Sequence, residues 1–207
     1  MRRLLHLAVF ALFALAASVA ARGDEPTTEK TDPKLPNAPG PFHAYNVTGK
    51  HMGRYHSQIS EYGLEPTVMV FTREVEFSDA LKSLLKQIDG AIEKNPAARL
   101  HAFVVVVSDD LPEVVGADDK TDDKRLEITA KLEDQGKGLA APHVDIVLAG
   151  ASDLAKYKLD DAGFAFYLFQ RNKVTASSVL KKEDKLSETV TMDAMKALVE
   201  KGGAVRK

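Results

Sequence analysis

The sequence predicts an α/β fold, with a mixed central β-sheet flanked by helices on both faces. Short, nearly continuous apolar runs, which are typical of strands buried on both sides, alternate along the chain with longer runs of helical period. This alternation predicts parallel strands joined by helical crossovers. Near the end, two strand-like runs separated by Arg171 and Asn172 indicate a hairpin, whose strands must be antiparallel. The sheet is therefore expected to contain both kinds of pairing.

Residues 1–21 are predicted to be a signal peptide. Arg2 and Arg3 precede an apolar run over residues 4–17, and small residues follow at positions 18–21. Such an order is typical of a secretory leader, and the run is short for a membrane span. We expect cleavage, export to a periplasmic or extracellular location, and no membrane contact afterwards. The chain contains no cysteine, so the exported domain has neither a disulfide nor a thiol.

Residues 22–41 are predicted to be a disordered linker, and residues 42–207 to be one folded domain. The linker is rich in proline and charged residues and has almost no apolar ones, so it cannot offset the entropy of ordering. The domain is long enough to bury an ordinary core. With a formal net charge of −2, the chain has no basic excess, and nucleic acid is not an expected partner.

The first half of the domain is expected to contain two strands and a helix. Residues 42–49 indicate a first strand, and the nearly continuous apolar run Pro66–Arg73 indicates a buried second one. A helix follows, because apolar residues recur at a spacing that places them on one face, and it should end before Pro96. These apolar residues are Leu81, Leu84, Leu85, Ile88 and Ile92.

The second half of the domain starts with the clearest strand, residues 99–109, whose four consecutive valines require cover on both faces. An acid-rich loop to Asp123 comes next. The remaining elements are a helix, a buried strand, the two strands of the hairpin and a last helix with Gly202 at its C-cap. They are expected at residues 124–136, 144–150, 165–170, 173–180 and 191–203.

Three segments resemble the thioredoxin-like fold. They read VMVFTREVEFSDALKSLL from Val68, LHAFVVVVSDD from Leu100 and AFYLFQRNKV from Ala165, and they match a strand with its active-site helix, the next strand and a hairpin. The resemblance implies a Cys-x-x-Cys motif at residues 76–79 and a cis-proline before Ala165, where this chain has Glu-Phe-Ser-Asp and Gly-Phe. Without a cysteine thiol the chain cannot perform thiol–disulfide exchange, and Ser78 is expected to be the helix N-cap.

A second resemblance is to exported thioredoxin-like proteins that carry a cysteine pair shortly before a Tyr-Gly-x-x-Pro segment. Here that segment begins at Tyr62, and the paired positions are Ser57 and Ser60. Two interpretations are open. The serines mark a replaced redox site, or they are polar turn or capping residues that precede Gly63.

The resemblance and the lack of cysteine together favour a non-catalytic binding or structural module. We expect it to bind an unknown protein or small-molecule ligand at the end of the sheet where thioredoxins hold their active-site loop. No catalytic residue, cofactor or metal ligand is predicted. The candidate binding surface consists of Ser57, Ser60, Tyr62, Glu76, Phe77 and Phe164.

One alternative is a metal-binding or metal-delivery protein that uses the histidines at the start of the domain. His43, His51 and His56 lie close together in sequence, and Glu61 is the carboxylate near them. Imidazole is a good ligand for zinc and copper. Spacings of eight and five residues match no common ligand motif, however, so surface histidines are the simpler interpretation.

Another alternative is an enzyme that works without cysteine. Glu76 and Asp79 lie where the active-site helix is expected to begin, and a carboxyl group there is a candidate general acid or base. A raised pKa at either residue would favour this function.

Overall fold

The computed structural model describes residues 40–111 and 119–197. The predicted signal peptide and nearly all of the predicted linker lie outside these residues, as do the segment 112–118 and the end of the chain from residue 198. Within the described part, no helix has the length and apolar character that crossing a bilayer requires.

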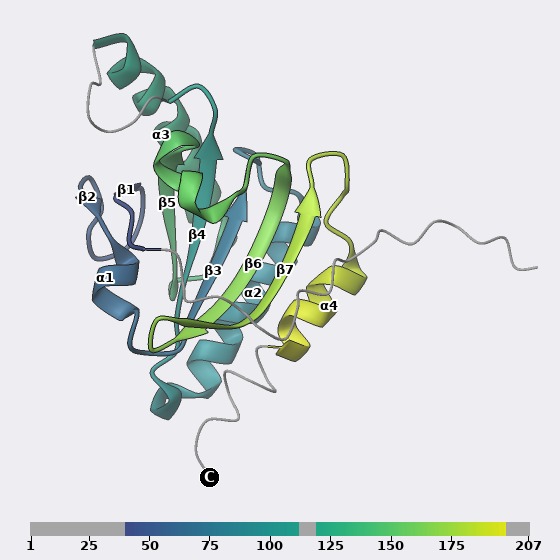
Figure 1. Cartoon of the computed structure of the whole chain (residues 1–207). Coiled ribbons are helices and arrows are strands. Elements are labelled where there is room, and N and C mark those ends of the chain that lie inside the picture. Colours follow the sequence, from purple (N-terminus) through teal and green to yellow (C-terminus); the bar gives the residue numbers. More distant parts are fainter. Residues whose placement is uncertain (1–39, 112–118, 198–207) are drawn as a thin grey trace, which may run out of the picture.

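A seven-stranded sheet forms the centre of the fold (Figure 1). The strands are β1 (Ala44–Asn46), β2 (Tyr55–His56), β3 (Thr67–Thr72), β4 (His101–Ser108), β5 (Val144–Gly150), β6 (Ala162–Gln170) and β7 (Lys173–Lys181). Their order across the sheet is β2-β1-β5-β4-β3-β6-β7. The central strands β5, β4 and β3 are parallel, and the strands on either side of them pair antiparallel. The prediction of a mixed sheet is confirmed.

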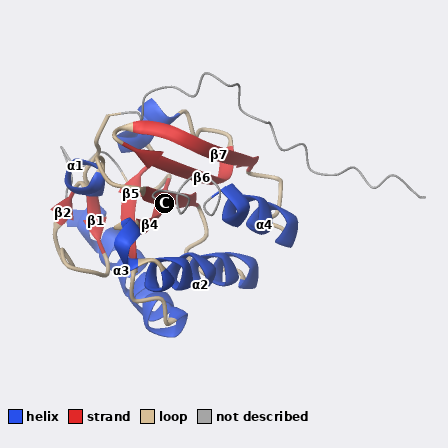
Figure 2. Cartoon of the chain, turned by 90° about the horizontal axis from the view of Figure 1, so that it is seen from below, coloured by secondary structure: helices blue, strands red, loops and turns tan. Residues whose placement is uncertain are grey.

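Helices cover both faces of the sheet, but unequally. The helical elements are α1 (Gln58–Tyr62), α2 (Asp79–Lys94), α3 (Asp119–Leu139), α4 (Glu188–Ala197) and the 3₁₀ helices η1 (Pro96–Ala98) and η2 (Ser152–Tyr157). Figure 2 shows α2, α3 and α4 together on one side of the sheet. Apolar residues of these three helices share one core with the strands, whereas α1 and η2 contribute to the core of the opposite face.

The four valines of β4 show why a central strand reads as a continuous apolar run. Val104 and Val106 point toward the α2 side, and Val105 and Val107 point toward the η2 side. Successive side chains of a strand alternate between faces, and both faces of this strand are buried. Helix α2 buries its predicted apolar face against the first of these cores, with Leu84 and Ile88 fully buried.

The start of the domain departs from the prediction. The expected first strand over residues 42–49 is reduced to the short β1, and the sequence did not predict β2 or α1 at all. Both are too short to show a period: α1 has five residues and β2 has two. The chain reverses between β1 and β2 through a loop in which Gly49 and Gly53 have φ angles of +83° and +79°, values that favour glycine.

Two later helices also begin earlier than predicted. Helix α3 begins at Asp119, so part of the acid-rich segment expected to be a loop is helical. Helix α4 begins at Glu188, and the predicted C-cap Gly202 lies outside the described residues. Charged and polar residues dominate the first turns of both helices. The spacing of apolar residues, from which a helix is predicted, therefore does not indicate where these two helices begin.

The N-cap of α2 is as predicted. The Ser78 hydroxyl accepts a hydrogen bond from the Leu81 N–H at 3.3 Å, and the Glu74 carboxylate accepts one from the Ser78 N–H at 2.7 Å. Asp79 follows in the first turn, where a negative charge interacts favourably with the helix dipole.

Candidate functional site

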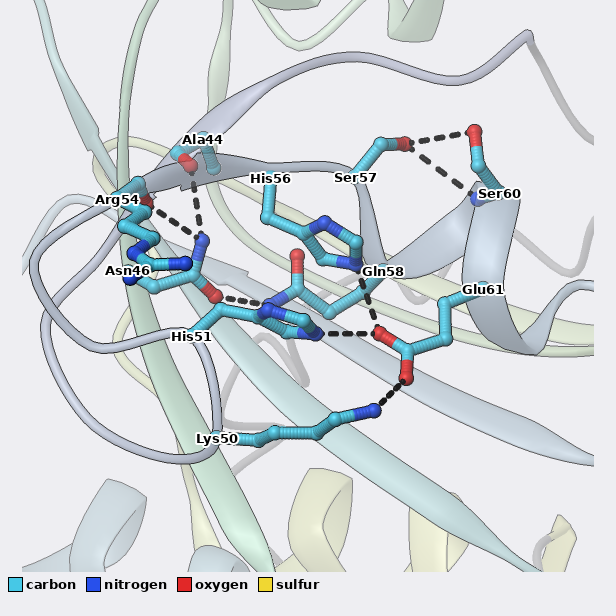
Figure 3. A network of polar contacts seen from close by, with 10 residues as sticks. All are labelled: Ala44, Asn46, Lys50, His51, Arg54, His56, Ser57, Gln58, Ser60 and Glu61. Atoms are coloured by element: carbon cyan, nitrogen blue, oxygen red, sulfur yellow. Dashed lines mark hydrogen bonds and ion pairs between the residues drawn. The ribbon is translucent and has the colours of Figure 1, made fainter.

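The loop between β1 and β2 faces α1, and together they assemble a cluster of two imidazoles and a carboxylate (Figure 3). His51 lies in the loop, His56 is the last residue of β2 and Glu61 belongs to α1. The Nε2 atoms of both histidines lie 2.7 Å from the same oxygen, Glu61 Oε2. The two rings are stacked, with centroids 3.7 Å apart. Lys50 Nζ contacts the other oxygen, Glu61 Oε1, at 2.8 Å.

A buried pair of amides fixes the loop and the helix relative to each other. Asn46 is fully buried, and its Nδ2 donates to the carbonyls of Ala44 and Arg54, at 3.0 Å each. Its Oδ1 accepts a hydrogen bond from Gln58 Nε2 in the first turn of α1. Because Asn46 holds the hairpin and Gln58 holds the helix, their contact sets the distance at which the histidines meet Glu61 (Figure 3).

Ser57 and Ser60 form the N-terminus of α1. The Ser57 hydroxyl accepts hydrogen bonds from the Ser60 N–H at 3.4 Å and the Ser60 hydroxyl at 3.2 Å. Ser57 is buried and Ser60 is exposed. The interpretation of Ser57 as a capping residue is thus confirmed. That the pair replaces two cysteines stays a hypothesis.

The cluster stabilises the ionised form of Glu61. Burial acts to raise the pKa of Glu61, but hydrogen bonds from Lys50, His51 and His56 outweigh it and lower the pKa to about 2. For the neighbouring Tyr62, burial raises the pKa to about 12, and the charge of Glu61 acts in the same direction. Glu61 is therefore a carboxylate throughout the neutral and moderately acidic range, as a metal ligand has to be.

A second carboxylate, Asp145 on β5, lies under the loop that carries His51. It is packed so closely against the loop that a Cβ atom added at Gly49 would fall 2.0 Å from Asp145 Oδ1. Burial raises the pKa of Asp145, and the charge of Glu61 adds to this effect while His51 and His101 oppose it. Asp145 therefore interacts with the cluster through its charge.

Tyr62, His101 and Glu65 form a second group of polar side chains next to the cluster. The ring of Tyr62 stacks on His101, with centroids 3.9 Å apart and an interplanar angle of 11°. His101 Nε2 lies 2.5 Å from Glu65 Oε2, and Glu65 also forms an ion pair with Arg99. Glu65 is thus already engaged by two cationic or polar partners.

The six residues of the predicted binding surface do not form one surface. Ser57, Ser60 and Tyr62 lie on or beside α1, whose Tyr62 carbonyl accepts a hydrogen bond from Thr67 at the start of β3. The other three residues lie at the opposite end of β3, where Thr72 pairs with Phe164. Six residues of strand separate the two groups, a length of about 17 Å.

Of the group at the far end of β3, only Glu76 is exposed. Phe77 and Phe164 belong to the hydrophobic core, with 3% and 5% of their surface accessible. Glu76 lines a cleft of about 540 Å³ together with Arg73, Asp109 and Lys131. Arg73 is held there by Asp109 at 2.6 Å and by two backbone carbonyls. That this end of the sheet binds a ligand stays a prediction.

The histidines predicted as alternative metal ligands are partly brought together. His51 and His56 meet, whereas His43 is exposed and does not join them. In the part of the chain that the structure describes, His51, His56 and Glu61 are the one set of three metal-ligating side chains whose ligand atoms lie within 4.8 Å of one another. Sequence reasoning missed the buried amides Asn46 and Gln58, which no local pattern marks.

No protein-family model and no curated protein matches the sequence. The fold, in contrast, matches many solved structures. A putative thiol:disulfide interchange protein DsbE from Chlorobium tepidum superposes with a TM-score of 0.52 at 10% identity, covering 81% of this chain and 96% of that one. A hypothetical protein from Sinorhizobium meliloti 1021 gives a TM-score of 0.55 at 12% identity, with 84% and 87% covered.

An uncharacterised conserved protein from Geobacillus kaustophilus is similar to the same degree, with a TM-score of 0.52, 14% identity and coverage of 89% and 92%. At such identities the similarity shows the fold and nothing further. The chain therefore has the thioredoxin-like fold that three of its segments resemble, and with no cysteine it lacks the thiols on which disulfide exchange depends.

Proposed function

We propose that this protein is an exported metal-binding protein, in which His51, His56 and Glu61 bind one divalent transition-metal ion, zinc or copper(II). One observation carries the proposal: two imidazoles from different elements direct the same ring nitrogen, Nε2, toward one carboxylate oxygen. Two neutral imidazoles and a carboxylate form a common protein ligand set for these ions.

The side chains of the cluster have to rearrange before an ion can bind. In a tetrahedral zinc site with bonds of about 2.0–2.1 Å, neighbouring ligand atoms lie about 3.3 Å apart. From their present 2.7 Å contacts, the two Nε2 atoms would have to withdraw from Glu61 by roughly 0.6 Å each. The two rings are also stacked at 20° to each other, so they have to turn until both ring planes contain the ion. The contact between Asn46 and Gln58 holds the loop and α1 in place while the side chains turn.

The proposal places metal binding ahead of the two other functions that the sequence suggested, a general binding module and an enzyme. A general binding module at the far end of β3 has less support, because Phe77 and Phe164 are part of the core. An enzyme that uses Glu76 or Asp79 has support only from the cleft that Glu76 lines. Export rests on Arg2, Arg3 and the apolar run that follows them.

Isothermal titration calorimetry on the purified, tag-free chain tests the proposal. Zinc should bind with a stoichiometry of one and a dissociation constant on the order of a micromolar or tighter. His51→Ala and His56→Ala should each weaken binding by about tenfold or more, because each removes one of three ligands. His43→Ala is the matched control, since His43 is an exposed histidine from the same part of the chain that does not reach the cluster.

Each variant is first compared with the unchanged chain by circular dichroism and urea unfolding in the presence of a chelator. A variant that remains folded but binds zinc as tightly as the unchanged chain would show that the histidine is not a ligand. No binding by the folded, unchanged chain would refute the proposal as a whole.

A further inference from the structure

We infer that the metal-loaded site keeps one coordination position open to solvent and binds a small oxyanion there, such as a carboxylate, with Lys50 as its second contact. The inference rests on the proposed metal site and names the ligand that this site takes. It follows from the number of protein ligands, from their exposure and from the charges around them.

The described residues supply three ligands to an ion that needs at least four. Zinc in structural sites is held by four protein ligands, whereas sites with three protein ligands keep a position for water or substrate. His51, His56 and Glu61 form a group of three, and no fourth histidine or carboxylate in the described residues joins them. Asp145, the next carboxylate, is packed under Gly49. The fourth position is therefore filled from solvent.

The cluster is accessible to a small ligand. The side chains of His51, His56 and Glu61 keep 23%, 29% and 21% of their surface exposed. None of the three belongs to the hydrophobic core on this face of the sheet, to which α1 contributes Ile59. A ligand can thus approach the ion from the solvent side without opening the fold.

The charges around a bound ion favour an anion. Lys50 places an ammonium group 2.8 Å from Glu61 Oε1, and its side chain is 69% exposed. A divalent ion together with Lys50 exceeds the combined negative charge of Glu61 and Asp145, so the loaded site is net positive. Lys50 is flexible enough to leave Glu61, once that carboxylate is shared with the ion, and to contact an oxygen of the bound anion.

Azide titration of the copper(II)-loaded chain tests this inference, because azide bound to copper(II) gives a charge-transfer absorption band. We expect the band to appear on titration and acetate to displace azide in competition. With copper(II) held at a saturating concentration, Lys50→Gln should weaken azide binding by about two- to fivefold, the effect of losing one exposed charged contact. Lys137→Gln, which changes an exposed lysine paired with Asp134 on α3, should leave azide binding unchanged.

The outcomes separate this inference from the metal site itself. Copper binding without an azide band would refute the open position and leave the metal site standing. Equal azide binding by the Lys50→Gln and unchanged chains would refute the role of Lys50. If the folded chain binds neither copper nor zinc, both the inference and the proposed function are wrong.

Discussion

Replacing Glu61 by glutamine should destabilise the metal-free protein at neutral pH and have progressively less effect as the pH falls. Glu61 accepts contacts from Lys50, His51 and His56, which lower its pKa from 4.5 to about 2. The unfolded chain therefore takes up the proton at higher pH than the folded one. The stabilisation by Glu61 is present above pH 4.5, declines as the pH falls below that value and is lost as it passes through about 2.

The loss of stability in Glu61→Gln can be worked out from the lowered pKa of Glu61. A change in pKa from 4.5 to about 2 corresponds to about 3 kcal/mol of folding free energy by linkage. The Glu61 side chain keeps 21% of its surface exposed, so water screens its contacts and we expect about 1–2 kcal/mol. The difference in unfolding free energy between the unchanged chain and Glu61→Gln should be less than half as large at pH 3 as at pH 7.

Urea unfolding in the presence of a chelator measures this difference at pH 7, 5, 4 and 3. Glu93→Gln is the control, because Glu93 is an exposed carboxylate on α2. At pH 7, Glu93→Gln should lower the free energy of unfolding by much less than Glu61→Gln does. A destabilisation by Glu61→Gln that is equally large at pH 7 and pH 3 would refute the reasoning, since it could not then come from the charge of the carboxylate.

Two further predictions concern the loop and the start of α1. Gly49→Ala should destabilise the protein by more than Gly53→Ala. Both residues have a positive φ, which strains an alanine at either position. A Cβ at Gly49 would also collide with Asp145, whereas none of the described atoms lies within 4 Å of a Cβ at Gly53. Adding Asp145→Ala should bring the first variant close to the second in thermal unfolding, and failure to do so would contradict the packing. Ser57→Cys with Ser60→Cys should form a disulfide in air, because the two hydroxyl oxygens are 3.2 Å apart. Mass spectrometry that finds only the dithiol would contradict that geometry.

The central fold could be predicted because its signals are local. The continuous apolar runs of β3, β4 and β5 have to be buried on both faces, which requires a sheet covered by helices. The hairpin was marked by Arg171 and Asn172, which adopt φ angles of 52° and 58°, as a two-residue turn demands. The short elements β2 and α1 could not be predicted, because they are held by contacts between segments and have no period of their own.

The site was only partly predictable for the same reason. The sequence contained His51, His56 and Glu61 at spacings that match no ligand motif, since they come from a loop, a short strand and a short helix. Their meeting depends on the contact between Asn46 and Gln58, which a local pattern cannot reveal. The analogy with the thioredoxin fold places Phe77 and Phe164 at a binding surface, whereas in the structure both side chains are buried in the core.

A difference map at the zinc absorption edge, from crystals grown or soaked with zinc, tests the central claim most directly. The account predicts an anomalous peak at about 2.0–2.2 Å from the Nε2 atoms of His51 and His56 and from a carboxylate oxygen of Glu61. A well-ordered cluster without a peak, with the hydrogen bonds from both histidines to Glu61 still in place, would contradict the account. A peak at His43 or His143 instead would contradict it as well.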